Sequence, residues 1–256
     1  MEQKEVAPWD EITSDERIPD TQTVFIVFCE DSVSEPYYLR SFQHDGLKVN
    51  AIPNQRKGKL NLNATVSQCV EDGLMVFNDG YSIKEGITQE IWCVYDRDAE
   101  NEDLSQVNPH HSTEWDLAIQ TAKKAGLQIA WSNDAFELWI LLHFEDIAPG
   151  NAVHRNFIYE RLTAVLKDIK PQTEEFAVIT SKDTFYYKHA FKGTYNFITF
   201  MLPLLKERTQ DAIQRAEKLA THYDNSTPYH NRNPYTLVYQ LITKLLAIAN
   251  PKQEKK

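Results

Sequence analysis

Four short apolar segments alternate with segments of helical character along the first 150 residues, and this alternation constrains the fold more than any other feature. The segments are rich in β-branched and aromatic residues, which is typical of buried strands. Strands that alternate with helices form a mostly parallel sheet flanked by helices. The sequence therefore predicts an α/β fold, with strands expected at Thr23–Cys29, Leu47–Ile52, Glu90–Tyr95 and Leu127–Trp131.

Helices are expected between and after these strands, and several carry start or stop signals. Ser34 is expected to cap the first helix, and a second covers Asn63–Phe77 with apolar residues on one face. Thr113 is expected to cap a third, which Gly126 ends. Ala135–Phe144 is apolar nearly all the way round, which indicates a buried helix.

The character of the chain changes near Gly150. Beyond this residue the pattern is mostly helical, with helices expected at Asn156–Lys167, at Tyr195–Thr221 with breaks, and at Pro234–Ala249, which Asn233 would cap. The first residues are polar and lack an apolar stretch. The expected organisation is a flexible arm over residues 1–20, an α/β core over 21–150 and a mainly helical C-terminal region over 151–256.

Charge and composition narrow the classes of function. The formal net charge is −10, which argues against a protein that grips nucleic acid over a wide surface and favours a local contact patch or a partner that supplies positive charge. No apolar run is long enough to span a bilayer and no secretory signal is recognisable, so no membrane contact and a cytoplasmic location are expected. The three cysteines form no C-x-x-C pair, which argues against a zinc site or a disulfide framework.

Acidic residues follow three of the predicted strands. In open α/β sheets, ligands bind outside the carboxyl ends of the strands, where Glu30, Asp96, Asp98 and then Asp134 or Glu137 are expected. Carboxylates suit Mg²⁺, so Glu30, Asp96 and Asp98 are candidate metal ligands, with Mn²⁺ as an expected substitute. A single strand-end acid is more often a helix cap or a solvated loop residue. The D-x-D pattern alone also occurs in glycosyltransferases and haloacid-dehalogenase phosphatases, although the latter carry it after their first strand.

Glu137 lies within the apolar segment AFELWILLHF. An ionised carboxylate on a buried helix is costly unless it is paired or binds a metal. Glu137 is therefore a candidate active-site residue, and Asn133, four residues earlier, is a candidate substrate-binding residue on the same face. The alternative is that Glu137 pairs with a core Arg or Lys. His143, at the end of this segment, is interpreted as a core histidine rather than a ligand.

Two basic stretches are candidates for contact with phosphates. Arg56, Lys57 and Lys59 form a short loop that could bind substrate, although such loops are usually just solvated. Around Lys188, further basic residues are interleaved with aromatic ones, a mixture that suits single-stranded nucleic acid but also fits a packed helix with a polar edge. The basic residues of this stretch are Lys182, Lys188, His189 and Lys192.

Together these residues resemble the RloB family. The segment FIVFCEDSVSEPYYL resembles its opening strand and helix, IWCVYDRD its strand ending in D-x-D, and IAWSNDAFELWILLHFE its longest motif. Tyr187-Lys188, AIQRAEKLA and NPYTLVYQLITKL resemble its C-terminal markers, so the resemblance covers nearly the whole chain after residue 22. The sequence departs from the family pattern at three positions, where Asp31 replaces Gly, Ser34 replaces Thr and Asp134 replaces Pro.

The resemblance implies a TOPRIM-like fold and a Mg²⁺-dependent nuclease that acts on RNA or DNA. In that scheme Glu30 is a general acid/base or ligand, Asp96 and Asp98 bind the metal, and Glu137 and Lys188 are catalytic. It also implies a bacterial anti-phage role beside an RloA-type ATPase partner. The alternative is a non-catalytic TOPRIM-fold partner subunit of an ATPase. A phosphatase or nucleotidyltransferase is disfavoured, because the chain shows no glycine-rich phosphate loop and no nucleophile elbow.

Overall fold

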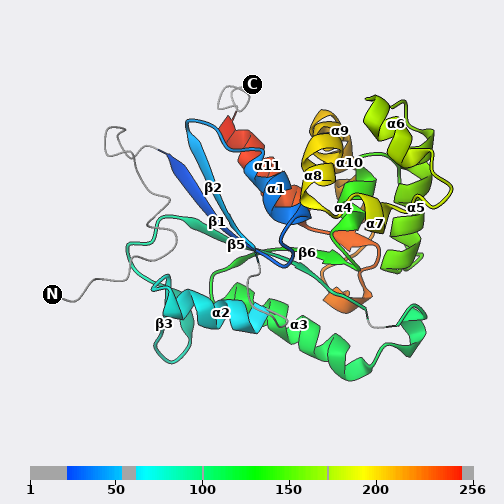
Figure 1. Cartoon of the computed structure of the whole chain (residues 1–256). Coiled ribbons are helices and arrows are strands. Elements are labelled where there is room, and N and C mark those ends of the chain that lie inside the picture. The colour runs from blue at the N-terminus through cyan, green and yellow to red at the C-terminus, as the bar shows by residue number, and fades with distance from the viewer. Residues whose placement is uncertain (1–21, 54–61, 100, 172, 250–256) are drawn as a thin grey trace.

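A computed structural model describes residues 22–53, 62–99, 101–171 and 173–249. Its centre is a five-stranded sheet in the order β2-β1-β5-β6-β7 (Figure 1). The first four of these strands are mutually parallel, and β7 pairs antiparallel with β6. The prediction of a mostly parallel sheet is confirmed. The strands are β1 (Thr23–Cys29), β2 (Leu47–Ile52), β5 (Glu90–Asp96), β6 (Gln128–Asn133) and β7 (Tyr235–Thr236).

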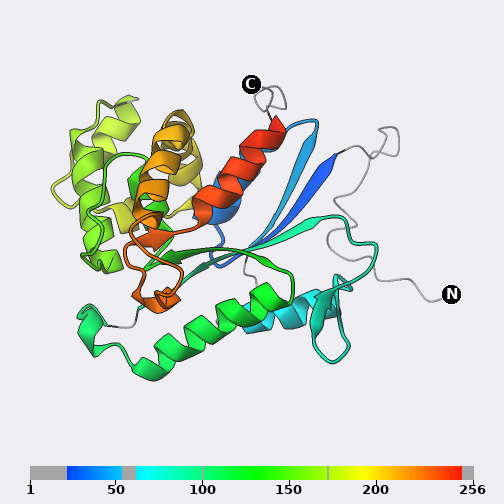
Figure 2. The ribbon, with the colours of Figure 1, turned by 180° about the vertical axis from the view of Figure 1, so that it is seen from behind.

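Successive side chains of the parallel strands point to opposite faces of the sheet, and both faces are buried. In β1, Phe25 and Val27 belong to one core cluster, whereas Ile26 and Phe28 belong to the other. Both faces need apolar residues, which explains why the strands have almost uninterrupted apolar sequences. Figures 1 and 2 show the helices divided between these two faces.

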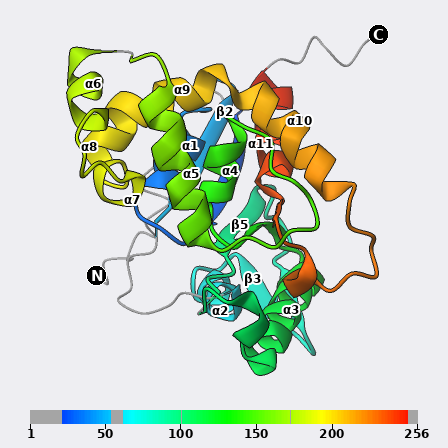
Figure 3. The same ribbon diagram turned by 90° about the vertical axis from the view of Figure 1, so that its right-hand side faces the viewer.

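One face is covered by α2, α3 and a small hairpin, and the other by α1, α11 and the remaining helices (Figure 2). The short helix α4 is buried along its whole length and packs between α5 and α10 (Figure 3). On the first face lie α2 (Leu62–Glu71), β3 (Met75–Phe77), β4 (Tyr81–Ile83) and α3 (Pro109–Lys124), with a 3₁₀ turn at Leu104–Gln106 before α3. On the second lie α1 (Ser34–Arg40), α4 (Glu137–Leu142) and α11 (Val238–Ala249).

The C-terminal region is mainly helical, as expected, but it also completes the sheet through β7. Residues of α10 and α11 join the same core cluster as those of β1, so the packing is continuous from the sheet into this region. The region's other elements are α5 (Arg155–Asp168), α6 (Glu174–Thr180), α7 (Tyr187–Ala190), α8 (Thr194–Asn196), a π-helical turn (Phe197–Met201), α9 (Leu202–Glu207), α10 (Thr209–Ala220) and a 3₁₀ turn (Tyr229–Asn231).

Several expected helix boundaries are wrong. The helix expected over Asn63–Phe77 ends at Glu71, and a positive φ of 72° at Gly73 lets the chain turn into the β3–β4 hairpin. The helix α3 begins at Pro109 rather than after Thr113, because the Asn108 side chain accepts the backbone N–H of His110 and caps it.

The expected N-terminal cap of the last helix is also wrong. The Asn233 side chain instead exchanges hydrogen bonds with the backbone of Val153, and β7 precedes the helix. Within the described ranges, no helix is long and apolar enough to cross a membrane.

Candidate functional site

Glu30 and Asp96 lie side by side because they follow adjacent parallel strands. Cys29 of β1 stands opposite Val94 of β5, so the chain delivers both acids to one end of the sheet. The backbone N–H of Asp96 donates to Glu30 Oε2 at 2.7 Å. Asp96 Oδ1 is buried and has no hydrogen-bond partner. An unpartnered buried carboxylate oxygen is costly, and it marks this point as one that a cation would stabilise.

The pKa values of both carboxyl groups are raised. Burial is the main reason why the pKa of Glu30 is raised to about 7. The hydrogen bond from the Asp96 backbone lowers this pKa, and the negative charge of Asp98 raises it. Burial also raises the pKa of Asp96 well above its usual value, and the charges of Glu30 and then Glu137 raise it further. Neighbouring carboxylates resist simultaneous ionisation because their negative charges repel in a poorly solvated site.

Asp98 is paired with an arginine. Its φ is 55°, in the left-handed region that Asp tolerates better than most residues, and its carboxylate forms an ion pair with the guanidinium of Arg155. Arg155 is the first residue of α5 and is 57 residues away in sequence. The structure therefore brings Asp98 to the same end of the sheet as Glu30 and Asp96 but gives it a different partner.

Arg155 also neutralises Asp134, which is fully buried. Its Nη2 lies 3.0 Å from Asp134 Oδ1, and its Nε and backbone N–H both donate to Asp134 Oδ2. The backbone N–H of Ala99 donates to Asp134 Oδ1 as well. Burial alone would lower the pKa of Arg155, but the charges of Asp134 and Asp98 outweigh it and hold that pKa above its usual value. Sequence reasoning missed Arg155, since its partners are distant along the chain.

Glu137 is buried at the start of α4 and is paired with a lysine. Its Oε1 lies 2.7 Å from Nζ of Lys192, whose side chain is 34% exposed. Burial would lower the pKa of Lys192, but the charge of Glu137 outweighs it and raises that pKa. The structure thus shows Glu137 paired with a lysine, which was the alternative to an active-site role. The lysine lies at the edge of the core rather than inside it. Glu137 also acts electrostatically on Asp96, so it belongs to the same acidic group.

The remaining candidates divide among several places. Lys188 is exposed, and its Nζ lies 5.4 Å from the ring centroid of Tyr159. The amide nitrogen of Asn133 donates to the backbone oxygens of His230 and Arg232, so it fixes a loop at the edge of the sheet. Arg56, Lys57 and Lys59 lie outside the described residues.

His143 is a core histidine, as interpreted from the sequence. Its ring nitrogens contact the Tyr38 hydroxyl at 3.0 Å and the Trp139 carbonyl oxygen at 2.8 Å. Burial lowers the pKa of His143 to about 3, so its ring is neutral near neutral pH. A ring whose two nitrogens are both engaged inside the core is not available as a ligand.

Asp31 and Glu35 hold the loop after β1. The Asp31 carboxylate accepts the backbone N–H groups of Val33, Ser34 and Glu35, so Asp31 caps α1 and the prediction of Ser34 as its cap is wrong. Glu35 Oε2 accepts the backbone N–H groups of Glu30, at 2.6 Å, and Asp31. Burial raises the pKa of Glu35 well above its usual value. The negative charges of Asp31, Asp96 and Glu30 raise it further. Its place near a helix start resembles an ordinary first-turn acid, which is why sequence reasoning missed it.

The donor set suits a hard divalent cation only in part. Carboxylate oxygens are the ligands that Mg²⁺ and Mn²⁺ prefer, and Asp96 Oδ1 needs a partner. Across the described residues, however, no three Asp, Glu, His or Cys side chains are spaced to hold a metal ion. Glu30 and Asp96 supply carboxylate oxygens at one point, whereas Asp98 would have to leave Arg155 to join them.

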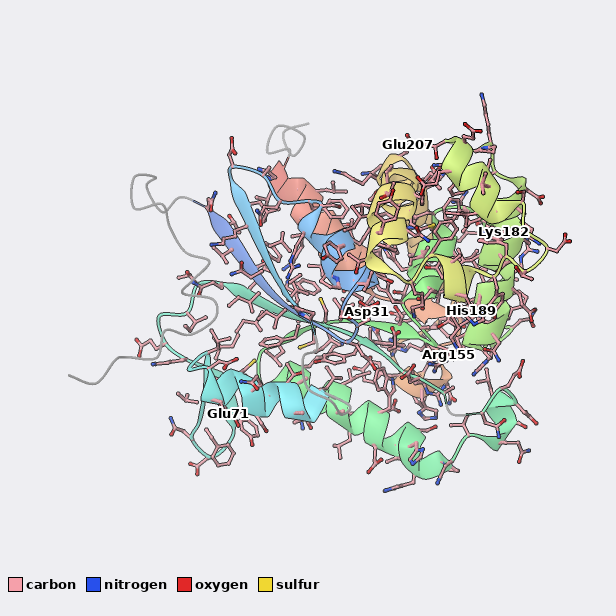
Figure 4. The ribbon with its side chains drawn as sticks, in the orientation of Figure 1. Asp31, Glu71, Arg155, Lys182, His189 and Glu207 are labelled. Atoms are coloured by element: carbon pink, nitrogen blue, oxygen red, sulfur yellow. The ribbon has the colours of Figure 1, made fainter. Side chains whose placement is uncertain are left out.

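The carboxylates, Arg155 and Lys192 all gather at the carboxyl ends of the strands. In Figure 4, Asp31 and Arg155 lie on this side, close to the C-terminal helices, whereas Glu71 lies on the opposite face on α2. The arrangement defines an α/β protein whose acidic strand-end site is lined by cations from its helical region. The family model described as RloB-like protein matches residues 25–245, so the chain belongs to the RloB-like family. No curated protein and no solved structure was found to match it.

Proposed function

We propose that the protein is a TOPRIM-type nuclease that hydrolyses phosphodiester bonds of RNA or DNA with Mg²⁺ or Mn²⁺. The observation that carries the proposal is the contact between Glu30 and Asp96, with Asp96 Oδ1 buried and unpartnered beside it. Such a pair at the carboxyl ends of adjacent parallel strands stands where α/β proteins bind ligands. When bound, the metal supplies an activated water and stabilises the leaving oxygen.

The chain's own residues have separate roles in this proposal. Asp96 and Glu30 would hold the metal, joined by Asp98 once its side chain leaves Arg155. Because burial raises the pKa of Glu30 to about 7 in the metal-free protein, binding of the cation would displace a proton from Glu30 near neutral pH. Glu137 adds negative charge beside Asp96 and holds Lys192 at the edge of the site.

The test is metal binding by variants of this carboxylate pair. Asp96→Asn removes one negative charge and is expected to weaken Mn²⁺ binding more than about tenfold, since even partners outside the coordination sphere typically contribute that much. Calorimetric titration of the purified protein with Mn²⁺ measures this directly. The matched control is Asp211→Asn, an exposed acid in the first turn of α10, which should bind Mn²⁺ like the wild type. Equal affinity of the wild type and Asp96→Asn would contradict the metal assignment.

A second function is favoured by the ion pairs of Arg155. Asp98 and Asp134 are both neutralised without a metal, which is the arrangement expected of a fold kept for binding rather than catalysis. In that case the chain is a non-catalytic subunit of an ATPase. Mn²⁺ binding without any cleavage of single-stranded or double-stranded RNA or DNA would support this function over the nuclease.

Family resemblance supports the biological setting that we propose. The protein would act in the cytoplasm as the effector of a bacterial anti-phage system, together with an RloA-type ATPase. Sequencing of cleaved nucleic acids after induction in cells would identify the substrate, with the Asp96→Asn variant as the inactive control. Identical cleavage patterns from both proteins would contradict an effector role for this site.

A further inference from the structure

Tyr159 on α5 gathers two lysines from a different segment of the chain. The Nζ atoms of Lys188 and Lys192 lie 5.4 and 5.6 Å from the centroid of its ring. Behind it, the ring of buried Tyr187 is stacked at a centroid distance of 6.2 Å. Ammonium groups over an aromatic face are attracted by its electron density. The ring therefore attracts both ammonium groups, of which Lys192 also pairs with Glu137.

Lys192 connects this group to the carboxylate site. Its partner Glu137 is 1% exposed and stands at the start of the buried helix α4, so the ion pair fixes where the ammonium lies. Glu137 in turn acts electrostatically on Asp96. The two lysines thus stand at the edge of the acidic site rather than on a remote surface.

Lys188 is the more available of the two. Its side chain is exposed, and in the described part of the chain it forms no ion pair with a carboxylate. Arg155 begins the same helix as Tyr159, four residues earlier and therefore on the same face. Arg155 on α5, Lys188 on α7 and Lys192 just after α7 consequently border the acidic site.

We infer that Lys188 and Lys192, seated on Tyr159, form a subsite that binds the phosphate backbone of single-stranded nucleic acid beside Glu30 and Asp96. The inference rests on the proposed nuclease function and names the residues that place its substrate. Ammonium groups bind phosphate as point charges, and such contacts position a strand without reading its sequence. Two lysines neutralise few phosphates, so the contact is short, as the net charge of −10 requires.

The test is binding of a short fluorescein-labelled single-stranded RNA, measured by fluorescence anisotropy in EDTA at low salt. Lys188→Gln and Lys192→Gln are each expected to weaken binding about fivefold. Each should also reduce the slope of log affinity against log salt by about 0.7, the contribution of one phosphate contact to a single strand. The matched control is Lys124→Gln, which removes the same charge from an exposed lysine in the last turn of α3, on the opposite face of the sheet. Its affinity should stay within about twofold of the wild type.

Loss of Lys192 leaves Glu137 buried without its partner, so folding needs its own control. The double variant Glu137→Gln/Lys192→Gln replaces the ion pair by two neutral amides, and it should fold, as circular dichroism would show, and still bind weakly. Wild-type affinity in this variant, or an equal loss in Lys124→Gln, would overturn the subsite. Because the RNA-binding assay contains no metal, neither result decides the nuclease proposal. That proposal is tested separately by the Mn²⁺ titration of Asp96→Asn. Normal Mn²⁺ binding by that variant would overturn the metal site and not the lysine contacts.

Discussion

Neighbouring carboxylates at the strand ends differ in their partners, and the partners decide what each residue does. Asp31 accepts three backbone N–H groups and stabilises the start of α1. Asp134 is neutralised by Arg155. Glu30 accepts the backbone N–H of Asp96, and the Asp96 carboxyl accepts a backbone hydrogen bond from Phe136, but Asp96 Oδ1 has no partner. Of these four acids, only the last two have a charge that the surrounding protein leaves largely uncompensated.

This uncompensated charge predicts how stability depends on pH. The pKa of Glu30 is raised by burial from 4.5 to about 7 in the folded protein. Below pH 4.5 the group is protonated in both the folded and the unfolded state, so it has no effect. As pH rises toward 7 the unfolded chain releases its proton first, which lowers the free energy of unfolding by a total of about 3 kcal/mol. Above 7 the effect stays constant.

Urea unfolding in EDTA at pH 5 and pH 7.5 measures this effect. The wild type should lose stability between these pH values, and Glu30→Gln should lose less, because its side chain does not ionise. Asp211→Asn, which alters an exposed acid on α10, should follow the wild type. Identical pH dependence of the wild type and Glu30→Gln would show that Glu30 ionises normally in the folded protein.

The sequence is informative about residues whose role follows from their own position in the chain. Glu30 and Asp96 were located because an acid directly after an apolar strand must emerge at the end of the sheet. Arg155 and Lys192 were not identified as partners, since nothing along the chain indicates that a C-terminal helical region returns to the strand ends. Asp31 replaces the Gly of the family pattern, and only the structure shows that its side chain accepts from backbone groups within four residues.

At the scale of elements, the start of α5 connects the ends of two neighbouring strands. Arg155 reaches Asp98 after β5 and Asp134 after β6, and it also lies near the Ala99 carbonyl oxygen. The backbone joins the same region, since the N–H of Asp98 donates to the Asp134 carbonyl oxygen at 3.1 Å. The first turn of α5 therefore fixes the segment that follows the D-x-D pair.

Removal of the Arg155 guanidinium should destabilise the protein strongly. Arg155→Met keeps an unbranched apolar stem but removes the guanidinium, so Asp134 stays charged and buried without its partner, which costs about 3–5 kcal/mol. Urea denaturation measures the free energy of unfolding. The control is Arg161→Met on the same helix, whose partner Glu145 lies in an exposed contact, and it should cost at most about 1 kcal/mol. Equal losses in the two variants would mean that the Arg155 ion pairs are as weak as a surface pair.

Strands were predicted better than helix ends and the small hairpin. The expected bounds of β1 and β2 agree with the structure, because a strand buried on both faces has to be apolar along its whole length. Helix α2 was expected to continue through Met75–Phe77, whose apolar residues suit either a helix or a strand. The strand β7 has only two residues, and its pairing with β6 depends on tertiary contacts that leave no local pattern.

At the scale of the whole molecule, the helical region both covers the sheet and supplies cations to its acidic edge. Residues of α10 and α11 pack in the same core cluster as β1, while Arg155 pairs with Asp98 after β5 and Lys192 pairs with Glu137 on α4. The chain as a whole nevertheless carries a net charge of −10. A few local cations on a strongly acidic protein support short, salt-sensitive contacts with nucleic acid rather than tight binding by the chain alone.

This balance predicts that a partner controls the activity. Family resemblance points to an ATPase encoded beside this protein, and the helical region over residues 151–256 is the expected docking surface, because the strand-end site has to stay open to substrate. Expression of the chain alone should cause growth arrest and nucleic-acid cleavage that co-expression with the neighbouring ATPase changes severalfold. The two proteins should also elute together on size-exclusion chromatography.

Asp96→Asn separates docking from catalysis in this experiment. The substitution lies at the strand ends, so the variant should still form the complex while it causes neither growth arrest nor cleavage with or without the ATPase. Loss of the complex in this variant would place the docking surface at the strand ends instead of in the helical region. If the wild-type chain is equally active alone and with the ATPase, and the two proteins do not co-elute, partner control is wrong. The metal site would then be judged by Mn²⁺ binding alone.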